Sequence, residues 1–155
     1  MAHASFSEGD NKNSVPSSSV YENNSPESIK ILAGIPTYNE EIAIGSIVSE
    51  AQQYADEVVV VDDGSTDNTV QIAQYVGATV IEHEMNKGKG GALRTLLGYA
   101  AEADNIDSLV VLDGDGQHIP EDIPDVVDPV LEVECDISIG SRYVEETETE
   151  TPVHR

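Results

Sequence analysis

The chain has little of several residue types, and each shortage excludes something. It has no tryptophan, a single cysteine and only seven lysines and arginines in 155 residues. The lone Cys135 excludes an intramolecular disulfide. No apolar run reaches the roughly 18 residues that a membrane-spanning helix needs, and no basic segment followed by an apolar one suggests a signal peptide. We therefore expect one domain with neither a transmembrane segment nor a leader in this sequence.

Acidic residues are in large excess. There are 30 aspartates and glutamates, and the formal net charge is −23. Like charges repel, so binding to nucleic acid or to an anionic membrane is not expected. Self-repulsion also destabilises a compact state, and strong salt screens it. The composition therefore favours a halophilic protein of a salt-rich cytoplasm, with an acidic protein of an ordinary cell as the alternative.

The two ends of the sequence differ in composition from its middle. Residues 1–28 are rich in serine and asparagine and have no periodicity, and residues 145–155 are dominated by glutamate and threonine. Such segments cannot bury enough apolar surface to fold, so both are predicted to be disordered tails. Residues 29–144 are predicted to form the single folded domain.

Strand and helix patterns alternate through residues 29–144. Short apolar runs predict strands at 29–35, 58–61, 78–81, 109–112 and 137–139. This alternation predicts an α/β, doubly wound fold with a mostly parallel sheet and helices on both faces. Three helices are expected to bury one face each, made by Ile44, Ile47, Val48 and Ala51, by Leu93, Leu96, Leu97 and Ala100, and by Ile123, Val126, Val127 and Val130.

Several residues mark the expected ends of helices. Ser65 or Thr66 is expected to cap a helix that ends near Gly77. Pro120 suits the first position of the last helix, and Pro129 is expected to end or kink it.

Two aspartates follow the predicted fourth strand. Asp113 and Asp115 flank Gly114, where a turn brings both carboxylates toward one cation. Mg²⁺ is typically held by one or two carboxylates together with substrate phosphates, and Gln117 offers a further oxygen. The pattern favours a metal site; the alternative is a solvated acidic turn.

Polar residues also follow the first two strands. Asp63 is expected to accept hydrogen bonds from a base or a ribose, whereas Asp62 suits a turn or a helix cap. Tyr38 and Glu40 suit stacking and hydrogen bonding to a nucleoside, although taken alone they are more typical of a surface tyrosine and a first-turn glutamate. Ligands of such sheets bind beyond the carboxyl ends of the strands, where these residues stand.

The few cations are clustered. Lys87, Lys89 and Arg94 lie within eight residues, among glycines that lead into a helix. Exposed N–H groups at a helix start, with lysines beside them, attract anions; a flexible loop is the alternative. Arg142 follows another predicted strand and is expected to meet a phosphate, or else a local carboxylate.

Together these motifs resemble the family-2 glycosyltransferases, and within them the dolichyl-phosphate mannose/glucose synthase branch. The family has the GT-A fold, a Rossmann-like nucleotide-diphospho-sugar transferase fold. The resemblance covers about residues 29–144. It rests on residues 35–41 (IPTYNEE), 59–67 (VVVDDGSTD), 86–92 (NKGKGGA), 112–117 (LDGDGQ) and 140–143 (GSRY).

The resemblance implies transfer of a sugar, with inversion, from a UDP- or GDP-linked donor to a polyprenyl or dolichyl phosphate. It implies a cytoplasmic protein or one peripheral to the cytoplasmic face of the membrane, acting in protein glycosylation. It assigns Mg²⁺ or Mn²⁺ to Asp113, Asp115 and Gln117, and catalytic roles to Asp115 and Arg142. The donor-binding residues that it implies are Pro36, Tyr38, Glu40, Val61, Asp63, Asp113, Gly114, Asp115 and Arg142.

One departure from the family pattern leads to an alternative function. Catalytic domains of the family continue well beyond the GSRY segment, whereas twelve residues follow Tyr143 here. We expect the acceptor side to be incomplete, so a nucleotide-sugar-binding fragment or subunit is the alternative to an active transferase. A phosphatase of the haloacid dehalogenase type is a remote alternative, because no lysine follows Gln117.

Overall fold

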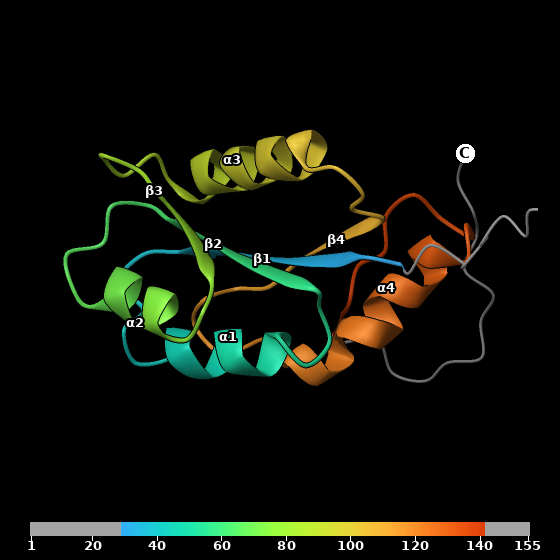
Figure 1. Cartoon of the computed structure of the whole chain (residues 1–155), viewed down its shortest axis with the longest axis horizontal. Helices are drawn as coiled ribbons and strands as arrows, with labels where there is room; N and C mark the ends of the chain where they lie inside the picture. The colour runs from blue at the N-terminus through green and yellow to red at the C-terminus, as the bar shows by residue number, and fades with distance from the viewer. Residues whose placement is uncertain (1–28, 142–155) are drawn as a thin grey trace, which may run out of the picture.

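The computed structural model describes residues 29–141, which fold as a four-stranded parallel sheet between two layers of helices (Figure 1). This confirms the predicted α/β class. The strands lie in the order β3-β2-β1-β4. Their bounds are Ile31–Thr37 for β1, Glu57–Asp62 for β2, Thr79–Glu82 for β3 and Ser108–Val111 for β4.

Helices cover both faces of the sheet. In Figure 1, α3 lies on one side and α1, α2 and α4 lie on the other. A short 3₁₀ turn, η1 (Pro120–Asp122), leads into α4. The helices are α1 (Ile44–Ala51), α2 (Thr69–Tyr75), α3 (Lys89–Glu102) and α4 (Ile123–Leu131).

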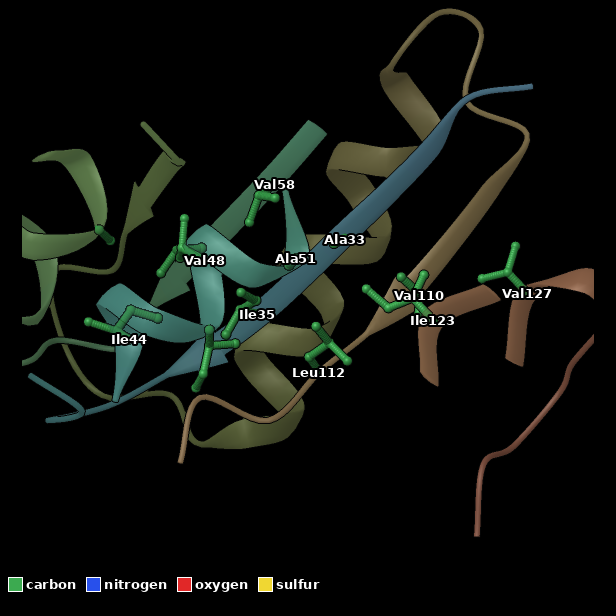
Figure 2. Close-up of a cluster of buried hydrophobic side chains, with 13 residues drawn as sticks. Ala33, Ile35, Ile44, Val48, Ala51, Val58, Val110, Leu112, Ile123 and Val127 are labelled. Atoms are coloured by element: carbon green, nitrogen blue, oxygen red, sulfur yellow. The ribbon is translucent and has the colours of Figure 1, made fainter. Parts of the chain in front are cut away.

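Each central strand sends alternate side chains into two separate cores. Ala33 and Ile35 of β1 face α1, α2 and α4 in the larger core, part of which Figure 2 shows. Leu32 of β1 and Val59 and Val61 of β2 face α3 in the smaller core. Strands buried on both faces need continuous apolar runs. The valines of β2 supply such a run.

The predicted fifth strand is wrong. Residues 137–139 form no strand, and Ile137 and Ile139 are 78% and 85% exposed. Within residues 29–141, β4 pairs only with β1, so nothing holds the three-residue alternation Ile-Ser-Ile in a ladder. Such a short alternation is weak evidence for a strand without a partner.

The inner face of α3 also differs from the prediction. Ala92 and Leu96 are buried, whereas Leu97 is 55% exposed. Tyr99 and Ala100 pack against the same core. The positions that face the core are therefore 92, 96, 99 and 100, of which the last two are partly buried; they keep helical spacing but are rotated away from Leu97.

The cap expected for the second helix needs correction. Helix α2 begins at Thr69, after Asn68, so neither Ser65 nor Thr66 caps it. Pro129 lies inside α4, and the helix ends two residues later at Leu131. Gly77 follows α2 with φ +94°, as expected of a glycine beyond a helix end. No helix among residues 29–141 has the length and apolar character needed to cross a bilayer.

Candidate active site

An open cleft lies beyond the carboxyl ends of β1, β2 and β4. Its volume is about 280 Å³. The strands are parallel, so their carboxyl ends meet at one edge of the sheet, where ligands of such folds bind. The cleft is lined by Pro36, Thr37, Tyr38, Glu40, Asp63, Asn86, Gly88, Lys89, Ala92, Asp113, Gly114 and Asp115.

The loop after β1 is held in place by the loop after β2. Asn39 has a left-handed backbone, φ +55°, which asparagine tolerates better than most residues. Its N–H donates to Ser65 Oγ at 2.8 Å, and its Oδ1 accepts from the Thr66 N–H at 2.9 Å. The Glu40 N–H donates to Thr69 Oγ1 at 2.8 Å. These bonds fix the backbone directly after Tyr38, a residue that is 46% exposed and lines the cleft.

Negative charge is concentrated in the cleft. Burial raises the pKa of the Glu40 carboxyl, and the charges of Asp115 and Asp67 raise it further. Carboxylates that repel one another in this way make a cation favourable at the same place.

Asp62, the last residue of β2, and Asp63, the residue after it, have different roles. Asp62 Oδ2 accepts from the N–H groups of Gly64 at 3.1 Å and Ser65 at 2.9 Å, so Asp62 shapes the turn. Asp63 lines the cleft, although it is only 4% exposed. This division agrees with the sequence analysis, which gave a turn role to Asp62.

Asp63 is held as a carboxylate despite its burial. Its Oδ1 accepts from His83 Nδ1 at 2.7 Å and from the Lys87 N–H at 2.8 Å. Burial alone would raise the pKa of this carboxyl. The hydrogen bonds from His83 and from the backbone of Lys87 and Gly88 outweigh that effect and lower the pKa below its usual value.

Asp113 pairs with a lysine from the glycine-rich loop. Its Oδ1 lies 2.5 Å from Lys89 Nζ. Its N–H donates to His118 Nδ1 at 3.0 Å, and His118 Nε2 lies 3.9 Å from its Oδ2. Asp113 is therefore held by both Lys89 and His118, and one of its carboxylate oxygens is already paired with the Lys89 ammonium group.

Asp115 is oriented by Gln117. The backbone N–H of Gln117 donates to Asp115 Oδ1 at 2.9 Å, and its Nε2 donates to Oδ2 at 2.7 Å. Between the two aspartates, a Cβ on Gly114 would lie 2.9 Å from Thr37 Oγ1. Only glycine lets the aspartate segment lie this close to β1.

These residues fit a divalent cation that is shared with a substrate. Among residues 29–141 no three His, Cys, Asp or Glu side chains are arranged to hold a metal by themselves. Asp113 and Asp115 nevertheless both face the cleft, and the Lys89 ammonium stands where a cation contacts Asp113. Mg²⁺ is commonly bound by two carboxylates, with phosphate oxygens of the substrate completing its coordination shell.

The structure brings most of the predicted site residues together. Pro36, Tyr38, Glu40, Asp63, Asp113, Gly114 and Asp115 all line the cleft. Arg142 lies outside the described residues.

Three other predicted residues are placed differently. Val61 is fully buried against α3 and is not in the cleft wall, so the structure gives it a packing role. Gln117 contacts Asp115 and lies outside the lining set of the cleft. Lys87 contributes its backbone N–H to the site.

The contacts of His83 and Thr37 at the site were not predicted from the sequence. His83 lies 20 residues from Asp63 and fits no metal-ligand spacing, so only the fold reveals the contact. The Thr37 hydroxyl is buried against Gly114, and no side-chain spacing indicates this.

Comparison with known proteins identifies the family. Residues 33–155 match the family model described as glycosyl transferase family 2. The chain belongs to this family. The membership decides against the phosphatase alternative and supports the predicted GT-A architecture.

Two relatives that are named as transferases are similar over most of the chain. The UDP-N-acetylglucosamine–dolichyl-phosphate N-acetylglucosaminyltransferase of Methanococcus voltae is 37% identical over 126 residues, covering 70% of this chain and 50% of the relative. The dolichol-phosphate mannosyltransferase of Pyrococcus furiosus is 36% identical over 124 residues, covering 75% of this chain and 34% of the relative. The chain thus spans half or less of the length of these relatives.

A solved structure of similar fold contains a nucleotide and a metal. It is the crystal structure of glucosyl-3-phosphoglycerate synthase from Mycobacterium tuberculosis in complex with Mn²⁺, UDP and glucosyl-3-phosphoglycerate. The TM-score is 0.57 and the sequence identity 32%, over 67% of this chain and 40% of that chain.

Proposed function

We propose that the cleft binds a nucleoside diphosphate sugar together with Mg²⁺ or Mn²⁺. The observation that carries the proposal is the meeting of Asp113 and Asp115 with Tyr38, Glu40 and Asp63 in one cleft at the carboxyl edge of the sheet. The glucosyl-3-phosphoglycerate synthase structure, which contains Mn²⁺ and UDP, supports this proposal. UDP is therefore the first nucleotide to test.

The nucleoside would lie at the β1 and β2 side of the cleft. The exposed ring of Tyr38 offers a flat apolar surface for a base. The carboxylate of Asp63 is an acceptor only, and therefore suits an N–H of the base or a ribose hydroxyl. Pro36 and Glu40 complete this side.

The diphosphate would lie at the β4 side. Asp113 and Asp115 would hold the cation, and Gln117 would keep Asp115 oriented. When bound, the cation offsets the negative charge that develops on the departing diphosphate. Lys89, whose ammonium lies at Asp113, would be close enough to contribute a second positive charge.

For the whole protein we propose sugar transfer to a polyprenyl or dolichyl phosphate. A phosphate oxygen of the acceptor would form a bond to the anomeric carbon as the bond from that carbon to the diphosphate breaks. Direct displacement of this kind inverts the anomeric centre. The acceptor is already anionic, so no side chain needs to remove a proton.

The support for this acceptor comes from the relatives, whose names include dolichyl-phosphate and dolichol-phosphate transferases. Such an acceptor would place the reaction at a membrane surface. We propose that Arg142 contacts the diphosphate or the acceptor phosphate, as its guanidinium suits either.

Calorimetric titration with UDP and with GDP tests the binding proposal. We expect binding in the presence of Mn²⁺ or Mg²⁺ and its loss with EDTA. Asp115→Ala should weaken binding, whereas Asp128→Ala, which removes an exposed carboxylate of α4, should not. Equal affinity with and without metal, or equal effects of the two substitutions, would refute the proposal.

A further inference from the structure

A buried histidine lies behind the wall of the cleft and joins three segments of the chain. His83 follows β3 and is 8% exposed. Its Nδ1 lies 2.7 Å from Asp63 Oδ1, after β2, and its Nε2 lies 2.8 Å from Thr95 Oγ1, on α3. His83 is not itself among the residues that line the cleft.

The two partners of the imidazole determine which of its nitrogens donates and which accepts a hydrogen bond. A carboxylate accepts only, so Nδ1 must donate its hydrogen to Asp63. In the neutral ring Nε2 is then an acceptor, and the Thr95 hydroxyl donates to it. The Thr95 hydroxyl thus provides the hydrogen bond that Nε2 needs, and it does not interfere with the bond between Nδ1 and Asp63.

The same carboxylate oxygen also anchors the glycine-rich loop. Asp63 Oδ1 accepts from the Lys87 N–H at 2.8 Å as well as from His83. Lys87 stands between Asn86 and Gly88, and both of these residues line the cleft. Hydrogen bonds to a single atom, Asp63 Oδ1, thus determine both the orientation of Asp63 and the position of this loop.

We propose that His83 is a positioning residue for nucleotide binding. By donating from Nδ1 it holds the Asp63 carboxylate and, through it, the loop at residues 86–88 in the geometry that receives the nucleoside. The inference rests on the proposed donor-binding function of the cleft. A binding group that is already oriented loses less freedom when the ligand arrives, so affinity is higher.

Two substitutions separate the contacts of the ring. The amide nitrogen of asparagine lies near the position of Nδ1 in histidine, and that of glutamine near Nε2. We expect His83→Gln to weaken UDP binding in the presence of Mn²⁺ by roughly tenfold or more, the usual effect of losing a hydrogen bond to a charged group. His83→Asn should stay within about threefold of the unsubstituted protein, because the bond to Asp63 is kept.

The affinity for Mn²⁺ in the absence of nucleotide distinguishes the positioning of Asp63 by His83 from a general loss of structure at the site. Asp113 and Asp115 are held by other residues, so both variants should bind Mn²⁺ without nucleotide as the unsubstituted protein does. UDP binding by His83→Gln equal to that of the unsubstituted protein would overturn the proposal. Equal loss of UDP and Mn²⁺ binding in both variants would also overturn it and indicate a structural role only.

A measurement on the unsubstituted protein covers the case in which the variants do not fold. Nitrogen NMR of the His83 imidazole should show a protonated Nδ1, and its signal should shift when UDP is added with Mn²⁺. An Nδ1 signal that does not respond to bound UDP would overturn the inference. Absence of UDP binding by the unsubstituted protein would instead refute the proposed function of the cleft.

Discussion

Lys89 and Asp113 form an ion pair at the mouth of the cleft. The side chains are 65% and 30% exposed, so the pair contributes little to the stability of the fold. The pair matters for metal binding, because the Lys89 ammonium and a divalent cation would compete for the same oxygen of Asp113. Binding of a metal at Asp113 therefore has to displace Lys89 or share the carboxylate with it.

Replacement of Lys89 should strengthen metal binding in the absence of nucleotide. For Lys89→Met we expect an affinity for Mn²⁺ that is higher by up to about fivefold, which corresponds to the free energy of an exposed ion pair. Titration followed by electron paramagnetic resonance measures free Mn²⁺ directly. Lys87→Met is the matched control, since it removes the same charge two residues away. Equal gains in the two variants would mean that only net charge matters.

At the scale of single residues, part of the site could be predicted from the sequence. Asp63, Asp113 and Asp115 follow apolar strand patterns, so their place at the sheet edge follows from the parallel fold. His83 could not be found in this way, because its partner is distant in the chain. Val61 was misplaced because strand residues alternate between two faces, and its side chain points into the core under α3.

At the scale of elements, α3 lies unusually close to β1. A Cβ on Gly34 would come within 2.1 Å of Leu96 Cδ2, and Leu96 is fully buried. A glycine in the middle of a strand commonly marks such a close approach. Since α3 begins at the glycine-rich loop, this contact also sets the distance of that loop from the sheet.

Addition of one methyl group at this contact should be destabilising. We expect Gly34→Ala to lower the free energy of unfolding by about 1–3 kcal/mol through overpacking. Gly98→Ala is the control: Gly98 lies in α3 with no atom within 4 Å of its would-be Cβ. It should stabilise the helix by about 0.5–1 kcal/mol. Urea unfolding of both variants tests the contact, and equal stability of the two would contradict it.

Most elements were predicted within a few residues, and the errors share a cause. Strand β2 was found because four consecutive valines indicate a doubly buried strand. A strand at 137–139 would need a partner strand, and the burial of Leu97 depends on how α3 is rotated against the sheet. Hydrophobic periodicity reveals neither. Strand pairing and helix rotation are decided by tertiary packing.

At the scale of the whole molecule, the acidic charge is spread through the fold. Between residues 30 and 144 lie 22 of the 30 acidic residues. Within residues 29–141, Lys89 with Asp113 is the one ion pair that involves a lysine or arginine. Most of the carboxylates in this part therefore repel one another without a compensating cation nearby.

Stability should therefore rise with salt. We expect the melting temperature to increase as KCl is raised from dilute to molar concentration, because screening reduces the repulsion among carboxylates. Differential scanning calorimetry over a KCl series measures this. A melting temperature that is constant or falls with salt would contradict the halophilic interpretation.

The proposed function requires that Asp113 and Asp115 hold a divalent cation together with a nucleotide in the cleft. A crystal structure of the chain with UDP and Mn²⁺, with anomalous diffraction used to locate the manganese, tests it most directly. We expect an anomalous peak about 2.0–2.3 Å from a carboxylate oxygen of Asp113 or Asp115, a typical metal–oxygen distance. The diphosphate should lie on the other side of the metal, and the uridine should lie beside Tyr38 and Asp63. A nucleotide bound in the cleft with manganese elsewhere, or no nucleotide in the cleft, would contradict it.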